Sequence, residues 1–250
     1  MPRRFLQGWL FIALALTSSV QARELHVAGT HFAHVFELAS NGEYVGLGAD
    51  LIREISKRTG HSVRFAIYPW ARAQALVERG EADILVGPYK TLEREARFAF
   101  SDRAFYQDRM LFYVRAGTRT QWNGDYETLR SRRIAAVHGW AYGAKFDRLR
   151  GIMQMGNAQT LENGLMMLVH DRVEMLATNQ RNTEDLLPQL ELAGKVHAIQ
   201  PPIDVKDGYF AFPKSPQYDN LRAKFNAVFN SMVDSGELAR LARKHDVHIP

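Results

Sequence analysis

The sequence predicts an α/β fold divided into two lobes. Strand and helix patterns alternate twice along the chain, first over residues 23–100 and again over residues 133–190. Between them lies a longer apolar segment, 101–115, which carries charges inside it and is expected to cross from one lobe to the other. Because strands linked through helices pair in parallel with right-handed crossovers, each lobe should contain a mostly parallel sheet flanked by helices.

The N-terminal segment 1–22 is typical of a secretory signal peptide. Arg3 and Arg4 supply a charged start, an apolar core follows, and residues 20–22 form a small-residue cleavage site. The apolar core is shorter than the ~20 residues that a membrane-spanning helix needs. We therefore expect an exported, soluble mature chain that is not inserted in a membrane.

The first alternation contains three strand patterns and two helix patterns before its last loop. They are a strand at 23–28, a loop with a hairpin turn at Asn41-Gly42, a helix at 50–59, a strand at 62–67, a helix opening at Pro69 and a strand at 84–86. Gly60 and Gly80 follow the two helices, as is usual for helix C-caps. The continuous apolar run at 84–86 predicts a strand that is buried on both faces.

The second alternation repeats this order, and a C-terminal section follows it. The expected elements are strands at 133–137, 152–155 and 173–177, helices at 142–149, 161–170 and 182–190, a strand at 209–212 and a helix pair over 218–244 interrupted at Ser235-Gly236. We expect lobe 1 to comprise residues 23–104 and 208–250, lobe 2 to comprise residues 105–207, and two hinge crossings to connect them.

Arg94 is the first candidate for a ligand-binding residue. It follows the buried strand at 84–86 and the helix start at Thr91, which places it where open α/β sheets bind ligands, beyond the carboxyl ends of their strands. The planar fork of donors on arginine suits a carboxylate. The alternative from this stretch alone is that Arg94 pairs with Glu93 or Glu95 on a solvated helix surface.

Composition argues against several other classes of function. The 32 Lys and Arg residues are interspersed with 27 Asp and Glu residues, so no basic stripe indicates nucleic-acid binding. There are no cysteines, hence no disulfides or thiolate metal site. His31 and His34 lack further ligands in the pattern of a metal site. No hydrolase or nucleotide-binding motif is present, so we expect no catalytic residue, metal or cofactor.

Six short blocks follow one another along the mature chain: 44–51 (YVGLGADL), 80–83 (GEAD), 91–94 (TLER) with Phe100-Ser101, 137–139 (VHG), Val173-Glu174 and 234–238 (DSGEL). Together they resemble the extracellular solute-binding proteins of family 3, which carry polar amino acids and related solutes to ABC importers. Their order and spacing match over nearly the whole mature chain. The resemblance implies a two-lobed fold of the type II periplasmic-binding-protein class, with the ligand between the lobes.

In lobe 1, the resemblance implies that Arg94 holds a ligand carboxylate, with backbone contacts from Gly87 and Tyr89. Trp70 matches a position that often carries a stacking aromatic ring, although a core role is the alternative. Phe36, in the opening loop, is as consistent with the core as with the cleft.

In lobe 2, the resemblance implies that His138, Trp140 and Ala141 cover the opposite face of the ligand. Asn179 stands at the strand end where amino-acid binders usually carry an Asp for the α-ammonium group. Because an amide has no charge, Asn179 should hold an ammonium less firmly than a carboxylate would. Either another acid such as Glu37 supplies the charge, or the ligand is a different small carboxylate or polar solute.

The function expected from this resemblance is that of a monomeric periplasmic binding protein without enzymatic activity. It would close around a small polar solute, most simply one with a carboxylate, and deliver it to an inner-membrane ABC permease. Two alternatives remain open. One is a dehydratase-like enzyme on the same scaffold, with Glu37 or Glu174 as its acid. The other is a ligand-sensing subunit of a membrane receptor.

Overall fold

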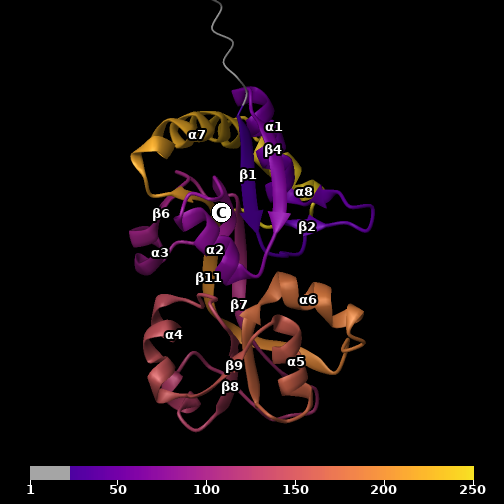
Figure 1. Ribbon diagram of the computed structural model, residues 1–250. Helices are drawn as coiled ribbons and strands as arrows, with labels where there is room; N and C mark the ends of the chain where they lie inside the picture. Colours follow the sequence, from indigo (N-terminus) through magenta and orange to yellow (C-terminus); the bar gives the residue numbers. More distant parts are fainter. Residues whose placement is uncertain (1–22) are drawn as a thin grey trace, which may run out of the picture.

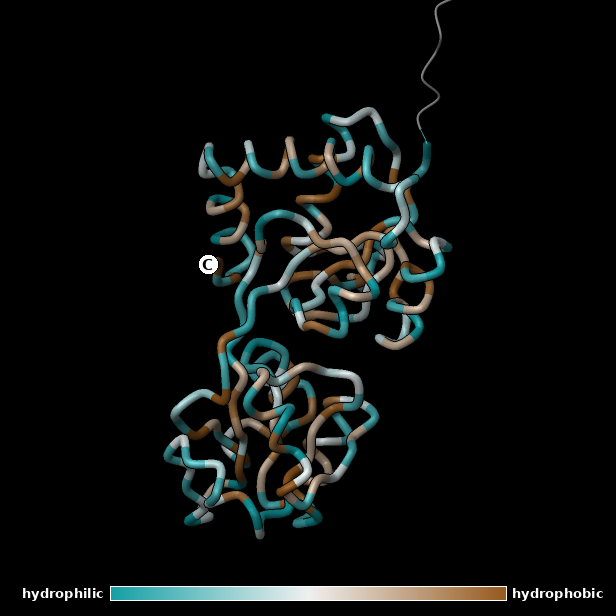
Figure 2. The backbone as a smooth tube through the Cα atoms, turned by 90° about the vertical axis from the view of Figure 1, so that its left-hand side faces the viewer, coloured by the Kyte–Doolittle hydropathy of each residue, from teal (hydrophilic) through white to brown (hydrophobic). Residues whose placement is uncertain are grey.

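The computed structural model describes residues 23–250, so the expected signal peptide at 1–22 lies outside the described residues. Two lobes are joined by two long strands, β7 (Tyr106–Arg115) and β11 (Val196–Pro213) (Figure 1). After a turn of 90°, the lobes are seen to meet at a narrow waist (Figure 2). Across the described part of the chain, every helix is too short or too polar to cross a membrane.

Lobe 1, the upper lobe in Figure 1, is built on parallel strands that β11 extends on one side. Its strands are β1 (Glu24–Gly29), β2 (Glu37–Leu38), β3 (Tyr44–Val45), β4 (Ser62–Ile67), β5 (Ile84–Tyr89) and β6 (Phe98–Phe100). Its helices are α1 (Leu47–Thr59), α2 (Trp70–Glu78), α3 (Leu92–Arg97), α7 (Asp219–Asp234) and α8 (Glu237–Lys244). Strand β1 pairs in parallel with both β4 and β5.

Lobe 2 repeats this plan with a second parallel set. Its strands are β8 (Arg133–Val137), β9 (Gln154–Ala158) and β10 (Met175–Asn179), and its helices are α4 (Ala144–Leu149), α5 (Leu161–Val169) and α6 (Gln180–Gln189). Strand β8 pairs in parallel with β9 and β10. In Figure 1, α4 lies on one side of these strands and α5 and α6 lie on the other.

One hydrogen-bonded sheet runs through both lobes. Its order is β4-β1-β5-β11-β7-β10-β8-β9, with β11 and β7 antiparallel to their neighbours in the middle. The predicted α/β class with a mostly parallel sheet in each lobe is confirmed. The two strands at the centre of the sheet are also the two connections between the lobes, so bending them moves one lobe against the other.

The C-terminal strand is much longer than expected. The sequence predicts a strand at 209–212, whereas β11 begins at Val196 and pairs with β7 from Val196 opposite Arg115 to Gly208 opposite Tyr106. Most of its first half is polar or only partly buried, so it lacks the apolar alternation that marks a strand in a sequence. Backbone pairing with β7 fixes this segment as a strand.

Three other boundaries also differ from expectation. Helix α1 starts at Leu47, three residues before the predicted start, because Gly46 takes a positive φ of 108° and turns the chain into the helix. Strand β9 lies at Gln154–Ala158 and not at 152–155, since a 3₁₀ turn occupies Arg150–Ile152. Strand β5 continues past Val86 to Tyr89, where it pairs with β11.

Asp50, in the first turn of α1, ties this helix to the end of α8. Its Oδ2 accepts from Lys244 Nζ at 2.8 Å and lies 2.8 Å from His245 Nε2. Burial alone would raise the pKa of Asp50, but these hydrogen bonds hold it below its ordinary value. The carboxylate therefore stabilises the fold above the unfolded pKa, and this contribution disappears as the pH falls through the folded pKa.

We expect Asp50→Asn to lower the free energy of unfolding by about 0.5 to 1 kcal/mol at pH 7, the range of solvent-screened ion pairs. The difference from wild type should shrink below about pH 4 and vanish at lower pH, because the wild-type carboxyl is then protonated as well. Urea unfolding at pH 7, 4 and 2.5 measures this. A constant difference across the three values would contradict the assigned role.

Candidate functional site

A cavity lies between the two lobes, beyond the carboxyl ends of β5 and β10. Its lining comprises Phe32, Trp70, Gly87, Tyr89, Arg94, Trp140, Ala141 and Asn179. The space open to the centre of a water-sized sphere is about 10 Å³, which is room for about one water molecule. A larger solute therefore enters only if the lobes separate, and the hinge strands β7 and β11 allow that motion.

Arg94 crosses the gap between the lobes. Thr91 caps α3 by accepting a hydrogen bond from the backbone N–H of Arg94, and the Arg94 side chain turns inward, leaving the residue 6% exposed. Nη1 donates to the Tyr89 carbonyl in lobe 1 at 3.1 Å, and Nη2 donates to the Gly139 carbonyl in lobe 2 at 3.0 Å. The alternative of a solvated pair with Glu93 or Glu95 is therefore wrong.

The Arg94 charge is poorly compensated in this position. Burial lowers the pKa of Arg94 from its ordinary value, and its bonded acceptors are neutral carbonyls. A buried guanidinium without a carboxylate partner carries an unrelieved desolvation penalty. An anion that enters the cavity would relieve that penalty.

Aromatic rings form the walls around Arg94. Phe32 and Trp70 meet edge to face with centroids 5.5 Å apart, and the guanidinium carbon of Arg94 lies 5.5 Å from the Trp70 ring. Tyr89 and Trp140 complete the walls from lobe 1 and lobe 2. These rings favour a solute with a flat or apolar body beside its charged group.

Gly87 is required where β5 reaches the cavity. Its φ is +84°, and a Cβ atom there would lie 3.0 Å from the Phe32 ring and 3.1 Å from the Tyr106 hydroxyl. The same Tyr106 hydroxyl donates to the Gly87 carbonyl at 2.7 Å. A larger residue would therefore disturb the wall and the backbone together.

Asn179 is the last residue of β10 and the N-cap of α6. Its Oδ1 accepts from the Asn182 N–H at 2.9 Å, which satisfies one of the free donors at the helix start. The residue is 2% exposed and lines the cavity from lobe 2, whereas Arg94 lines it from lobe 1. The carboxyl end of β10 therefore places a neutral amide at the cavity, at the position where the resemblance led us to look for an acid.

His138 lies outside the cavity, on its rim. It is exposed and lines an outer groove to which both lobes contribute. The space in this groove that is open to the centre of a water-sized sphere is about 620 Å³. The basic residues of that groove are Lys90, Arg94, Arg97, Arg150 and Lys206, and its acidic residues are Glu93 and Asp147. This excess of positive charge favours the approach of an anion.

Phe36 does not line the cavity, so its inclusion among the candidate site residues is corrected and the core role, left open as the alternative, is the one that the structure shows. It is fully buried, stacks on Tyr44 with centroids 5.7 Å apart and also packs against Phe65. A tight turn pairs Phe32 with Phe36 through backbone hydrogen bonds. The Phe32 ring lies at the cavity, whereas the Phe36 ring lies in the core. Phe32 takes the place at the cavity wall.

The two acids considered for an enzyme also lie elsewhere. Glu37 accepts a hydrogen bond from the His34 N–H, within its own turn. Glu174 precedes β10 and binds Arg132 at 3.0 Å, at the end of the strand opposite Asn179. Neither residue belongs to the cavity lining.

A buried charge network that was not predicted from the sequence lies behind Tyr89. Asp108 on β7 accepts from the Tyr89 hydroxyl at 2.6 Å and from Arg181 Nε and Nη2 at 3.0 and 2.8 Å. Arg181, on α6, also donates to the Ala33 carbonyl in lobe 1. Burial is the main reason that the Tyr89 pKa is raised well above its ordinary value, and Asp108 adds to the effect, so the hydroxyl remains a donor.

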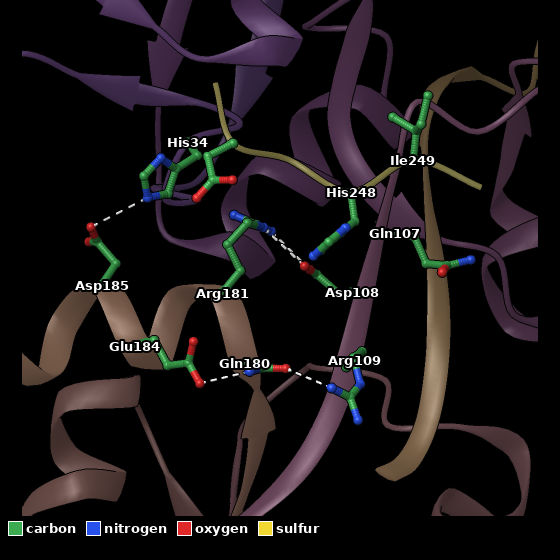
Figure 3. A pocket seen from close by; sticks show the side chains of 11 residues that line it. His34, Gln107, Asp108, Arg109, Gln180, Arg181, Glu184, Asp185, His248 and Ile249 are labelled. Carbon is green, nitrogen blue, oxygen red and sulfur yellow. Dashed lines mark hydrogen bonds and ion pairs between the residues drawn. The ribbon is translucent and has the colours of Figure 1, made fainter. Parts of the chain in front are cut away.

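Arg181 and Asp108 face each other beside the hinge in a second hollow, which His34 and Asp185 also line (Figure 3). Tyr89 connects the two sites, since its ring lines the cavity and its hydroxyl reaches Asp108. The signal in the sequence was a charged residue within the apolar segment 101–115. A charge in such a segment is seldom fully buried unless it is paired.

Solved structures with the same fold are numerous. A substrate-binding protein of an ABC uptake transporter from Streptococcus pneumoniae, with bound histidine, has a TM-score of 0.74 at 17% identity, covering 88% of this chain and 91% of that chain. A mutant of ArgBP from T. maritima has a TM-score of 0.74 at 18% identity, covering 88% and 94%. A histidine kinase sensor domain similar to periplasmic binding proteins has a TM-score of 0.80 at 18% identity, covering 92% and 99%.

These identities are low, and the structural matches establish the shared fold. No curated protein sequence matches the chain. The family model of the bacterial extracellular solute-binding proteins, family 3, matches residues 25–247, which is nearly everything after the expected signal peptide. The chain therefore belongs to the bacterial extracellular solute-binding proteins of family 3.

Proposed function

We propose that this protein binds a small carboxylate-bearing solute in the periplasm and delivers it to an inner-membrane ABC permease. The observation that carries the proposal is the Arg94 guanidinium, buried in an interlobe cavity and bonded to a carbonyl of each lobe. In this role Arg94 binds the carboxylate, Trp70, Tyr89 and Trp140 enclose the body of the solute, and Gly87, Ala141 and Asn179 shape the remaining wall. His138 stands at the entrance.

Binding would act by shifting a population between open and closed lobes. A solute that touches both lobes binds the closed arrangement better than the open one and so stabilises it. Hinge strands β7 and β11 absorb the motion, and the closed form is the one that a permease would recognise. No covalent step is needed.

Two features of the comparisons support this proposal. Structural neighbours include proteins whose structures contain bound histidine or arginine, both of which carry a carboxylate. One of these neighbours is the substrate-binding protein of an ABC uptake transporter. Import and ligand sensing would share the same lobe closure, and they differ in the membrane protein that the closed form contacts.

The proposal predicts stabilisation by the correct solute. A ligand present at one hundred times its dissociation constant should stabilise the fold by about 2.7 kcal/mol. For a chain of this size, that corresponds to a rise in melting temperature of roughly 5 to 10 °C. Thermal unfolding of residues 23–250 with a panel of amino acids and small carboxylates measures it. If no amino acid or small carboxylate of the panel shifts the melting temperature, the proposal that Arg94 binds a ligand carboxylate is refuted.

A further inference from the structure

The cavity lining contains one charged side chain, the guanidinium of Arg94. The other seven residues are aromatic, small or an amide, and no Asp or Glu of the described chain is among them. The electrostatic character of the site is therefore that of a single buried cation. A zwitterionic ligand would place its carboxylate well and leave its ammonium group without a charged partner.

Four hydrogen-bond acceptors of the lining each already accept a hydrogen bond within the protein. The carbonyl of Gly87 accepts from Tyr106, the carbonyl of Tyr89 accepts from Arg94, and the Asn179 carbonyl accepts from Thr183. The Asn179 Oδ1 caps α6. An ammonium group brings three donors and no acceptor, so it would have to compete for each of these oxygens.

The donors of the lining are in the opposite situation. Within residues 23–250, no hydrogen bond is formed by the indole N–H of Trp70 or Trp140 or by Nδ2 of Asn179. Arg94 adds guanidinium hydrogens beyond the two that bond carbonyls. The site is thus rich in donors and poor in acceptors, which suits an anion.

The acids nearest to the cavity are all paired with arginines. Asp108 lies behind Tyr89 and is bound by Arg181. In the outer groove, the carboxylate of Glu93 lies 3.2 Å from Arg97, and that of Asp147 lies 3.0 Å from Arg150. Each of them already has a cationic partner, so a ligand ammonium would gain less from it than from an unpaired carboxylate. The carboxylates around the cavity that could pair with a ligand ammonium group are therefore already paired with arginines.

We propose that the site selects carboxylates that lack an α-ammonium group and that carry a flat or apolar body. The inference rests on the proposed function and narrows it from amino acids and their relatives to deaminated acids. An ammonium buried without a partner is strongly disfavoured, whereas hydrogen at the same carbon fits an aromatic wall. Asn179, the one polar side chain of lobe 2 in the lining, is the residue that sets this preference.

The test compares pairs of compounds that differ only in the α-ammonium group. The pairs are 3-phenylpropanoate with L-phenylalanine, 3-(indol-3-yl)propanoate with L-tryptophan, and 4-methylpentanoate with L-leucine. Isothermal titration calorimetry with residues 23–250 should show that, in at least one pair, the deaminated acid binds at least about 100-fold more tightly than the amino acid.

Asn179→Asp provides the decisive variant. Asp and Asn are equivalent N-cap residues, so α6 should keep its start, and thermal unfolding of the variant checks that it folds. The added carboxylate should tighten binding of the amino acid at least about tenfold and weaken binding of its deaminated partner by a similar factor. Asn179→Ser is the matched control, since Ser also caps the helix but adds no charge, and it should not gain affinity for the amino acid.

The outcomes separate the two proposals. If amino acids bind wild type as tightly as their deaminated partners, the inference fails while the carboxylate-binding function stands. Unchanged preference in Asn179→Asp likewise overturns the inference. Failure of all six compounds to bind overturns the inference and counts against the carboxylate clamp too.

Discussion

Arg94→Ala is expected to raise the dissociation constant of the bound carboxylate by about 100-fold or more. Two charge-assisted hydrogen bonds in the fork of a guanidinium contribute roughly 3 kcal/mol, and this corresponds to about two powers of ten in affinity. Arg94 also reaches the Gly139 carbonyl, so its removal deletes a direct link between the lobes. Calorimetric titration of wild type and variant with the best ligand of the panel measures the change.

The effect of Arg94→Ala on the unliganded fold should be small. The variant loses hydrogen bonds to two carbonyls, but it also removes a buried charge whose pKa is lowered by burial. These changes oppose each other, so the free energy of unfolding should stay within about 1 kcal/mol of wild type. Weak binding by a variant with a normal melting temperature then reports the loss of the clamp and not unfolding.

Two further variants sharpen this experiment. Arg94→Lys keeps the charge but loses the planar fork, so its affinity should fall between those of wild type and Arg94→Ala. Arg79→Ala is the control, because Arg79 is an exposed arginine of the same lobe that pairs with Glu81 outside the cavity. Its affinity should match that of wild type. An Arg94→Ala protein with unchanged affinity would remove the basis of the proposed function.

Local sequence signals made Arg94 a candidate, although from that stretch alone a solvated pair with Glu93 or Glu95 was an equal alternative. The apolar run at 84–86 and the cap at Thr91 act over a few residues, and together they predicted a guanidinium beyond the end of a buried strand. The alternation of strands and helices along the chain in both lobes followed from similar signals. The structure gathers seven of the nine expected site residues in the cavity lining.

Two errors, at Phe36 and at β11, share a physical cause, which is dependence on packing or pairing with other segments of the chain. Phe32 and Phe36 have the same residue type and lie in one loop, and only the packing of Tyr44 and Phe65 decides which ring enters the core. The first half of β11 is a strand because β7 pairs with it. Neither fact is encoded in local periodicity.

The ion pair of Asp108 and Arg181 is the clearest case, because 73 residues separate its members. Its side chains are 1% and 11% exposed, and it connects β7 to α6 beside the hinge. Burial by itself would lower the pKa of Arg181, but Asp108 holds that pKa above its ordinary value. The pair therefore remains charged in the folded protein and each member depends on the other.

Arg181→Ala should consequently destabilise the protein by roughly 3 to 5 kcal/mol, because it leaves the Asp108 carboxylate buried with the Tyr89 hydroxyl as its remaining partner. The melting temperature should fall by roughly 6 to 20 °C. Arg103→Ala is the matched control, since Arg103 pairs with Asp234 at 2.6 Å but both side chains are largely exposed. It should cost less than about 1 kcal/mol.

A double-mutant cycle tests whether the pair acts as a unit. Asp108→Ala and Arg181→Ala each leave one buried charge, whereas the double variant leaves none, so its destabilisation should fall short of the sum by about 1 to 3 kcal/mol. Additive effects would show that the two residues contribute separately.

Because Arg181 also donates to the Ala33 carbonyl in lobe 1, its loss removes a contact that favours lobe closure. A ligand that requires the closed form then binds Arg181→Ala more weakly, although Arg181 is outside the cavity lining.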